Sequence, residues 1–173
     1  GSLVRWPVEK VFYDMHRGSF IKAEGRYREQ VDLLGHAHLG GKTVLNLIDG
    51  LFCGKHPIDP VPRRMRSSPF LGDWSKSLFA SQDPVALDSV GLDFLRAEYD
   101  DHPAQPGSDD YLHEAALADR APSGTVYDPD HARPEVPLKS LGVHEHWNDP
   151  VSKQYSRNLG TGPGIELVPV GIV

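Results

Sequence analysis

The chain has 173 residues and a formal net charge of −6, and this length is enough for one domain with a hydrophobic core. The acidic balance disfavours nucleic acid as the main partner, because phosphate binding relies on clustered Lys and Arg side chains. The single cysteine, Cys53, excludes an internal disulfide, an iron–sulfur cluster and a zinc site made of several thiolates of this chain.

No run approaches the roughly 20 apolar residues that span a bilayer, so membrane insertion is not expected. The first residues lack the apolar core of a signal peptide, and Gly1 and Ser2 resemble a cloning remnant. The compartment therefore stays open, including export of a longer protein. The 17 glycines and 15 prolines predict many turns. We expect residues 1–173 to form a single loop-rich α/β domain, which could be the C-terminal part of a longer protein.

Taken in chain order, the first predicted element is a helix over 22–34, which Gly25 weakens. The nearly continuous apolar run 43–49 then predicts a strand buried on both faces, as in a parallel or mixed sheet. Residues 77–81 predict a second strand. We therefore expect a mixed, mostly parallel sheet flanked by helices.

The strongest helix signal follows the second strand. Asp83 suits the N-cap, Pro84 suits the first helical position, and an apolar face continues to Tyr99. A shorter helix is predicted over 108–118, and 164–170 alternates weakly enough to suggest an edge strand.

Two long segments, 57–73 and 121–137, are rich in Pro, Asp and Arg and show little periodicity. Loops of this length in a compact domain are usually functional or mobile. We predict that 57–73 is a mobile surface loop near a functional site.

Two His-x-His pairs are the main candidates for a metal site: His36 with His38, and His144 with His146. Alternate side chains of an extended chain point to the same face, so each pair could present two imidazoles to one transition-metal ion. The alternative is that these histidines are hydrogen-bonded in surface loops.

The pair at 144 and 146 ranks first because of its neighbours. Val143 and Trp147 could bury one face of the pair, while Glu145 and Asp149 could accept hydrogen bonds that orient the rings. The third and fourth candidate ligands are His56 and Asp49, which flank the loop after the first strand.

Other polar residues fit structural roles as well as functional ones. Asp49 and Asp83 would lie at the carboxyl ends of strands, the edge where open α/β sheets bind ligands, but they also suit a turn and a helix cap. Asp88 would be costly to bury unpaired and is expected to pair with an Arg or a backbone donor. Cys53 is expected to be an inert, partly buried thiol rather than a nucleophile.

The residues 40–51 (GGKTVLNLIDGL) and 77–91 (SLFASQDPVALDSVG) together resemble the C-terminal part of the proteins catalogued as domain of unknown function 362. The resemblance covers roughly residues 35–99. The aspartates of the family pattern fall on Asp49, Asp83 and Asp88. The resemblance implies no settled activity, and the iron–sulfur modules fused to some members are not present here.

These observations lead to two hypotheses. In the first, the chain is a metal-binding domain or a metal-dependent enzyme, hydrolytic or redox, whose ion is held by Asp49, His56 and one His-x-His pair and acts on an unknown small molecule or polymer. The alternative is a non-catalytic module that contacts a polymer or a protein through loop aromatics. These aromatics are Trp74, Tyr111, Trp147 and Tyr155.

Overall fold

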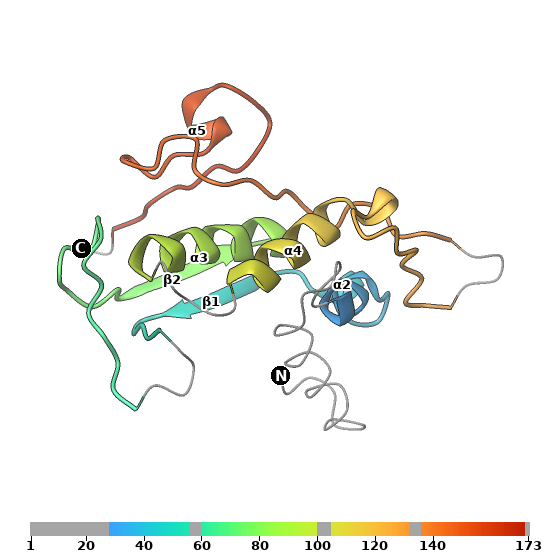
Figure 1. Ribbon diagram of the computed structural model, residues 1–173, viewed down its shortest axis with the longest axis horizontal. Helices are drawn as coiled ribbons and strands as arrows, with labels where there is room; N and C mark the ends of the chain where they lie inside the picture. The colour runs from blue at the N-terminus through green and yellow to red at the C-terminus, as the bar shows by residue number, and fades with distance from the viewer. Residues whose placement is uncertain (1–27, 56–59, 100–104, 132–135, 172–173) are drawn as a thin grey trace.

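The computed structural model describes residues 28–55, 60–99, 105–131 and 136–171. Two strands and four helices make up the regular structure of these residues (Figure 1). They are α2 (Arg28–Gly35), β1 (Asn46–Gly50), β2 (Ser77–Ser81), α3 (Pro84–Glu98), α4 (Gln105–Ala116) and α5 (Ser156–Leu159), with 3₁₀ turns η1 (Gly40–Lys42) and η2 (Ala118–Arg120). None of the helices in these ranges is long and apolar enough to cross a membrane.

The sheet differs from the prediction. In the described residues it has two strands, β1 and β2, which pair antiparallel with Ile48 opposite Phe79. The expected mixed, mostly parallel sheet is therefore wrong. Side chains alternate along both strands, so Ile48 and Phe79 face inward while Leu47 and Leu78 are 63% and 67% exposed. The apolar run 43–49 predicted a strand buried on both faces, but the strand is covered on one face only, because α3 packs on that side alone.

Helix α3 lies across the inner face of the strands (Figure 1). It begins as predicted: the Asp83 carboxylate accepts a hydrogen bond from the backbone N–H of Ala86 at 2.9 Å, and Pro84 is the first helical residue. The N-cap removes one unpaired N–H and fixes where the helix leaves β2. The second Asp83 oxygen accepts from the backbone N–H of Val143 at 2.9 Å, which ties the C-terminal third of the chain to this helix.

Helix α4 packs beside α3 and against α2. It begins three residues before the predicted start at 108, and α2 covers the later part of the helix predicted over 22–34, whose first residues lie outside the described ranges. A core cluster joins the three helices. Its buried members are Val31, Val85, Leu92, Tyr111, Leu112, Ala115, Ala118, Ala121 and Tyr127.

The loop predicted to be mobile is held against the body where the structure describes it, from residue 60 onward. Met65 is buried and forms an isolated bridge with Asp73. Glu98 at the end of α3 accepts hydrogen bonds from the backbone N–H groups of Arg66 and Ser67 at 2.9–3.0 Å. These contacts fix the loop to α3, so it does not act as a free lid.

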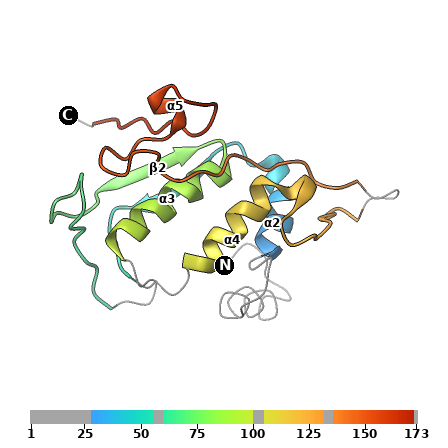
Figure 2. The same cartoon turned by 45° about the horizontal axis from the view of Figure 1, so that its top comes forward.

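The C-terminal segment has little regular structure but runs along α3 and β2 (Figure 2). Residues 164–170 form no strand, contrary to the prediction, because two of their backbone N–H groups donate to side chains: that of Ile165 to Glu145 and that of Leu167 to Asn158. Tyr155 and Ile165 anchor the segment in a second core cluster with Phe94. This course brings residues 143–147 next to α3 and α4.

Candidate metal centre

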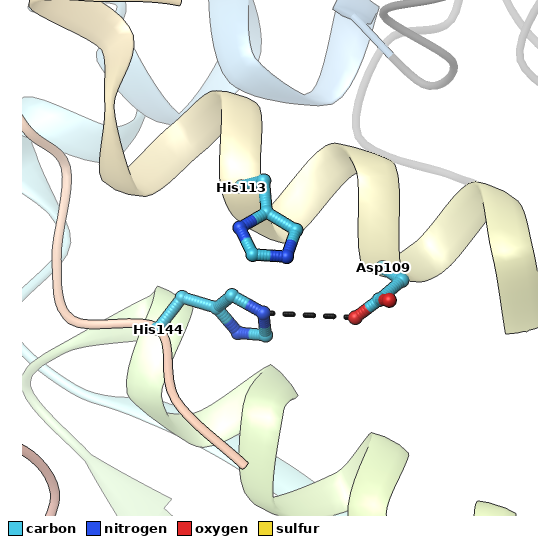
Figure 3. A group of neighbouring side chains, drawn as sticks. All are labelled: Asp109, His113 and His144. Atoms are coloured by element: carbon cyan, nitrogen blue, oxygen red, sulfur yellow. Dashed lines mark ion pairs between the residues drawn. The ribbon is translucent and has the colours of Figure 1, made fainter. Parts of the chain in front are cut away.

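The centre starts from two residues of α4, Asp109 and His113. They are four positions apart, so in a helix their side chains lie on the same face. Both point toward the strand-like segment that follows residue 142 (Figure 3). The helix thus presents one carboxylate and one imidazole to the same space.

His144 completes the group from that segment. One potential ligand atom from each of Asp109, His113 and His144 lies within 4.8 Å of the other two. The Nε2 atom of His144 is 3.6 Å from Oδ1 of Asp109, and the rings of His113 and His144 meet edge to face with centroids 4.4 Å apart. Three side chains from two distant parts of the sequence therefore converge.

The ring orientation of His144 is set by Ser89 on α3. The Ser89 hydroxyl donates its only hydrogen to the carbonyl of Val85 at 2.7 Å. Its oxygen is also 2.8 Å from Nδ1 of His144, so Nδ1 must be the donor in that contact. The neutral ring then carries its hydrogen on Nδ1 and its free lone pair on Nε2, the atom that faces Asp109.

The surroundings of His144 favour this neutral form. Its side chain is 3% exposed, and Nε2 has no hydrogen-bond partner among the described residues. Burial, followed by the neighbouring His113 and His146, lowers the pKa of His144 to about 4, although Asp109 opposes the shift. A neutral imidazole with a buried, unused lone pair is the form that binds metal ions.

His146 lies beside His144 and is oriented by a carboxylate. The two rings are perpendicular, with centroids 4.9 Å apart, as expected for alternate residues of an extended chain. Nδ1 of His146 donates to Oδ1 of Asp93 at 2.7 Å. Asp93 is 5% exposed and also accepts from the Tyr155 hydroxyl and the backbone N–H of Trp147, each at 3.0 Å. A buried carboxylate with these donors holds the ring in place.

The other nitrogen of His146 reaches Asp109. Nε2 is 3.0 Å from Oδ1 of Asp109 and 3.0 Å from the Arg96 guanidinium. If the ring is protonated, its Nε2 donates to Asp109. If the ring is neutral, Nε2 accepts a hydrogen bond from Arg96. Arg96 is also 3.7 Å from Asp109, so His146 and Arg96 together position this carboxylate.

The remaining predicted ligands do not join this group. Nδ1 of His36 accepts from the backbone N–H of His38 at 3.0 Å and lies 3.6 Å from Asp130, so that lone pair is already used. Asp49 closes a turn by accepting from the N–H of Leu51. His56 lies outside the described residues.

The carboxylates that were expected to orient the histidines have other roles. Glu145 accepts hydrogen bonds from Ser156 and Ile165. Asp149 closes a local turn with Val151 and Ser152. Their places next to the imidazoles are taken by Asp93 and Ser89 of α3.

Several other expectations change with the burial of the side chains. Tyr111 and Tyr155 are 4% and 0% exposed, so they belong to the core rather than to an exposed aromatic surface. Within the described residues Asp88 pairs with the Tyr111 hydroxyl at 3.3 Å, rather than with the Arg or backbone donor that was expected. Cys53, in contrast, is partly buried as predicted, and burial raises the pKa of its thiol.

Sequence reasoning missed Asp109 and His113, although a signal was present. An Asp and a His four residues apart within a predicted helix share a face and can bind one ion. Ser89 and Asp93 have the same spacing on α3, and they contact His144 and His146 respectively. Which two helix faces meet depends on tertiary packing, and spacing alone does not reveal it.

Comparisons with protein-family models, with curated proteins and with solved structures find no significant match to this chain. The resemblance to domain of unknown function 362 therefore stays a prediction.

Proposed function

We propose that this chain is a metal-binding domain that holds one divalent transition-metal ion between α4 and the 143–147 segment. The ligands are Asp109, His113 and Nε2 of His144. His146 and Arg96 position Asp109 rather than bind the ion. This assignment keeps one histidine of the predicted pair as a ligand and moves the centre from β1 to α4.

The observation that carries the proposal is the buried Nε2 atom of His144. A buried polar atom without a hydrogen bond is costly, and native structures rarely leave one without a reason. Here Ser89 fixes the lone pair toward a carboxylate and a second imidazole. A metal ion would satisfy all three groups at once.

The spacing agrees with zinc-like coordination. Metal–ligand bonds of about 2.0–2.2 Å at tetrahedral angles place two ligand atoms about 3.4 Å apart. The separation between His144 Nε2 and Asp109 Oδ1 is 3.6 Å, while the wider spread of the whole group, up to 4.8 Å, requires His113 to rotate inward. His113 is exposed, so this rotation meets little resistance.

Three protein ligands leave one coordination position for water or a substrate atom, as in catalytic zinc sites. Two imidazoles and one carboxylate also suit iron(II). Such a centre supports metal-assisted hydrolysis or, with iron, oxidation. The exposed side of His113 is where solvent would reach the open position.

The test is calorimetric titration of zinc and cobalt(II) into metal-stripped protein, with thermal unfolding measured in parallel. We expect one ion per chain and a rise in Tm, because an ion that binds only the folded state stabilises it. The visible spectrum of bound cobalt(II) would report nitrogen and oxygen ligands in a four- or five-coordinate site.

Three variants separate ligands from neighbours. His144→Ala and His113→Ala should each abolish one-to-one binding, and His146→Ala should weaken it without abolishing it. The control is a His36→Ala, His38→Ala double variant, which removes two imidazoles outside the group. Unchanged binding in His144→Ala, or loss of binding in the control, would overturn the proposal.

A further inference from the structure

A second feature of the molecule, separate from the metal centre, is a cleft of about 430 Å³ between α3, α4 and the end of β1. This volume lies within the usual range for small-molecule sites, roughly 300–1,000 Å³. Its walls are mainly apolar and aromatic. They include Ile48, Phe52, Met65, Phe70, Phe79 and Phe94.

The polar groups of this cleft are acidic or neutral. Asp88 and Asp49 line it, with Gln30, Ser75, Ser108 and Tyr111. No Lys, Arg or His is found among the described residues that line it. An apolar space with two carboxylates and no basic side chain is complementary to an organic cation.

One residue that lines the cleft has a hydroxyl without a hydrogen-bond partner in the part of the chain that the structure describes. Ser75 is 6% exposed, and its Oγ has no hydrogen bond within the described residues. Ser75 lines the cleft, but this oxygen is itself buried from solvent, so a ligand would reach it only after the side chain turns.

Asp88 offers the best anchor for a positive charge. Tyr111 donates to Oδ2 of Asp88 at 3.3 Å, and Asp88 itself lines the cleft. Asp88 is exposed in part, but desolvation by the surrounding protein raises the pKa of its carboxyl despite the Tyr111 hydrogen bond. An ammonium group beside it would relieve that cost, because an opposite charge favours the carboxylate.

We infer that the cleft binds a small aromatic or aliphatic amine, with its ammonium group on Asp88 and its apolar body among the phenylalanine rings. The rings add cation–π attraction to the burial of apolar surface. The cleft and the metal centre use neighbouring residues that point different ways: Asp88 and Tyr111 face the cleft, while Ser89 and His113 face the centre. The inference does not depend on metal binding.

The test compares three fluorescent probes with one ring system, 2-naphthylmethylamine, 2-naphthylmethanol and 2-naphthoate, titrated at neutral pH with a chelator present. We expect the amine to bind most tightly, the alcohol more weakly, and the carboxylate not at all. Equal affinities for all three probes, or no binding of the amine, would overturn the inference. The chelator makes the outcome independent of the metal centre.

Asp88→Asn should weaken binding of the amine roughly tenfold and leave the alcohol almost unchanged, because only the amine loses a charged partner. Asp119→Asn, an exposed residue outside the cleft, changes the net charge equally and should have no effect. A similar loss in both variants would indicate general electrostatic attraction and contradict the assignment.

Alkylation of Cys53 can show whether the amine binds in the cleft. It is the single cysteine of the chain and lines the cleft. Saturating amine should slow alkylation of Cys53 by iodoacetamide severalfold in the wild type, and the same concentration should protect much less in Asp88→Asn. Binding of the amine with no protection of Cys53 would place it elsewhere and overturn the inference.

Discussion

At the scale of single residues, Ser89 determines how the His144 ring is oriented. Its hydroxyl is anchored on the Val85 carbonyl and so dictates which nitrogen of His144 carries the hydrogen. Residues that orient a ligand histidine through its second nitrogen typically contribute 10- to 100-fold to metal affinity. The Ser89 side chain never needs to touch the ion to have this effect.

The first prediction follows from this contact. Ser89→Ala should weaken zinc binding by about 10-fold or more, because Nδ1 of His144 loses its acceptor and the ring can turn. Competition with a chromogenic chelator would measure the affinity. Ser68→Ala, which removes an exposed hydroxyl outside the centre, is the control. Equal zinc affinity in the Ser89 variant and the wild type would show that the hydrogen bond has no positioning role.

The second prediction concerns Asp83. Removing its carboxylate in Asp83→Ala should lower the free energy of unfolding by about 1–2 kcal/mol, because α3 loses its N-cap. Urea denaturation of the metal-free protein measures this. A stability equal to that of the wild type would contradict the capping role.

At the scale of elements, Glu98 joins the end of α3 to the 57–73 loop. Its side chain is 2% exposed and accepts from two backbone N–H groups and from the Arg66 guanidinium at 3.1 Å. Burial raises the pKa of Glu98, but these hydrogen bonds together outweigh it and hold the pKa below its usual value. The carboxylate therefore replaces the regular pairing that the loop lacks.

The third prediction is that Glu98→Gln costs about 1.5–3 kcal/mol at neutral pH, the usual contribution of hydrogen bonds to a charged group. Glu166→Gln is the control. Glu166 forms an exposed ion pair with Arg157, and such pairs contribute about 0–1 kcal/mol. Chemical denaturation of both variants would show the difference, and equal losses would contradict the role of burial.

The same contacts give a fourth prediction, on pH. A carboxyl with a lowered pKa in the folded state stabilises it above the ordinary value of 4.5, and that stability is lost as pH falls through the folded pKa. The difference in stability between the wild type and Glu98→Gln should therefore be largest above pH 4.5 and shrink below it. A difference that stays constant down to acid pH would contradict this assignment.

The elements that the sequence predicted well have local causes. The Asp-Pro junction defined the start of α3, and 77–81 matches β2. The predictions that were wrong concern which elements pair or pack with one another. The sequence of the run 43–49 does not indicate that its strand pairs antiparallel with 77–81, or that helices cover only one face of the two strands. The site follows the same rule: the extended spacing predicted that His144 and His146 lie together, whereas the meeting of α3, α4 and this segment depends on packing.

At the scale of the whole molecule, the apolar residues divide into a packed interior around α3 and an open sheet face. Leu112 is 1% exposed within the core cluster shared by α2, α3 and α4, while Leu47 on the outer face of β1 is 63% exposed. Similar side chains thus have very different surroundings.

The fifth prediction uses this pair. Leu112→Ala should lower the free energy of unfolding by about 2–5 kcal/mol, since it removes buried methyl groups and leaves a cavity. Leu47→Ala should change it by no more than about 0.5 kcal/mol. Equal losses in thermal or urea denaturation would mean that the outer face of β1 is covered in solution.

The close approach of Gly142 to Asp83 has a consequence for how this molecule could vary. A methyl group at Gly142 would collide with the Asp83 carboxylate, which both caps α3 and holds the N–H of Val143, the residue before His144. Any larger residue must push the carboxylate aside and loosen both attachments. Gly142 therefore constrains the proposed centre indirectly. It has no side chain that could bind an ion, yet a larger residue there would disturb the backbone that carries His144, the proposed ligand two residues away.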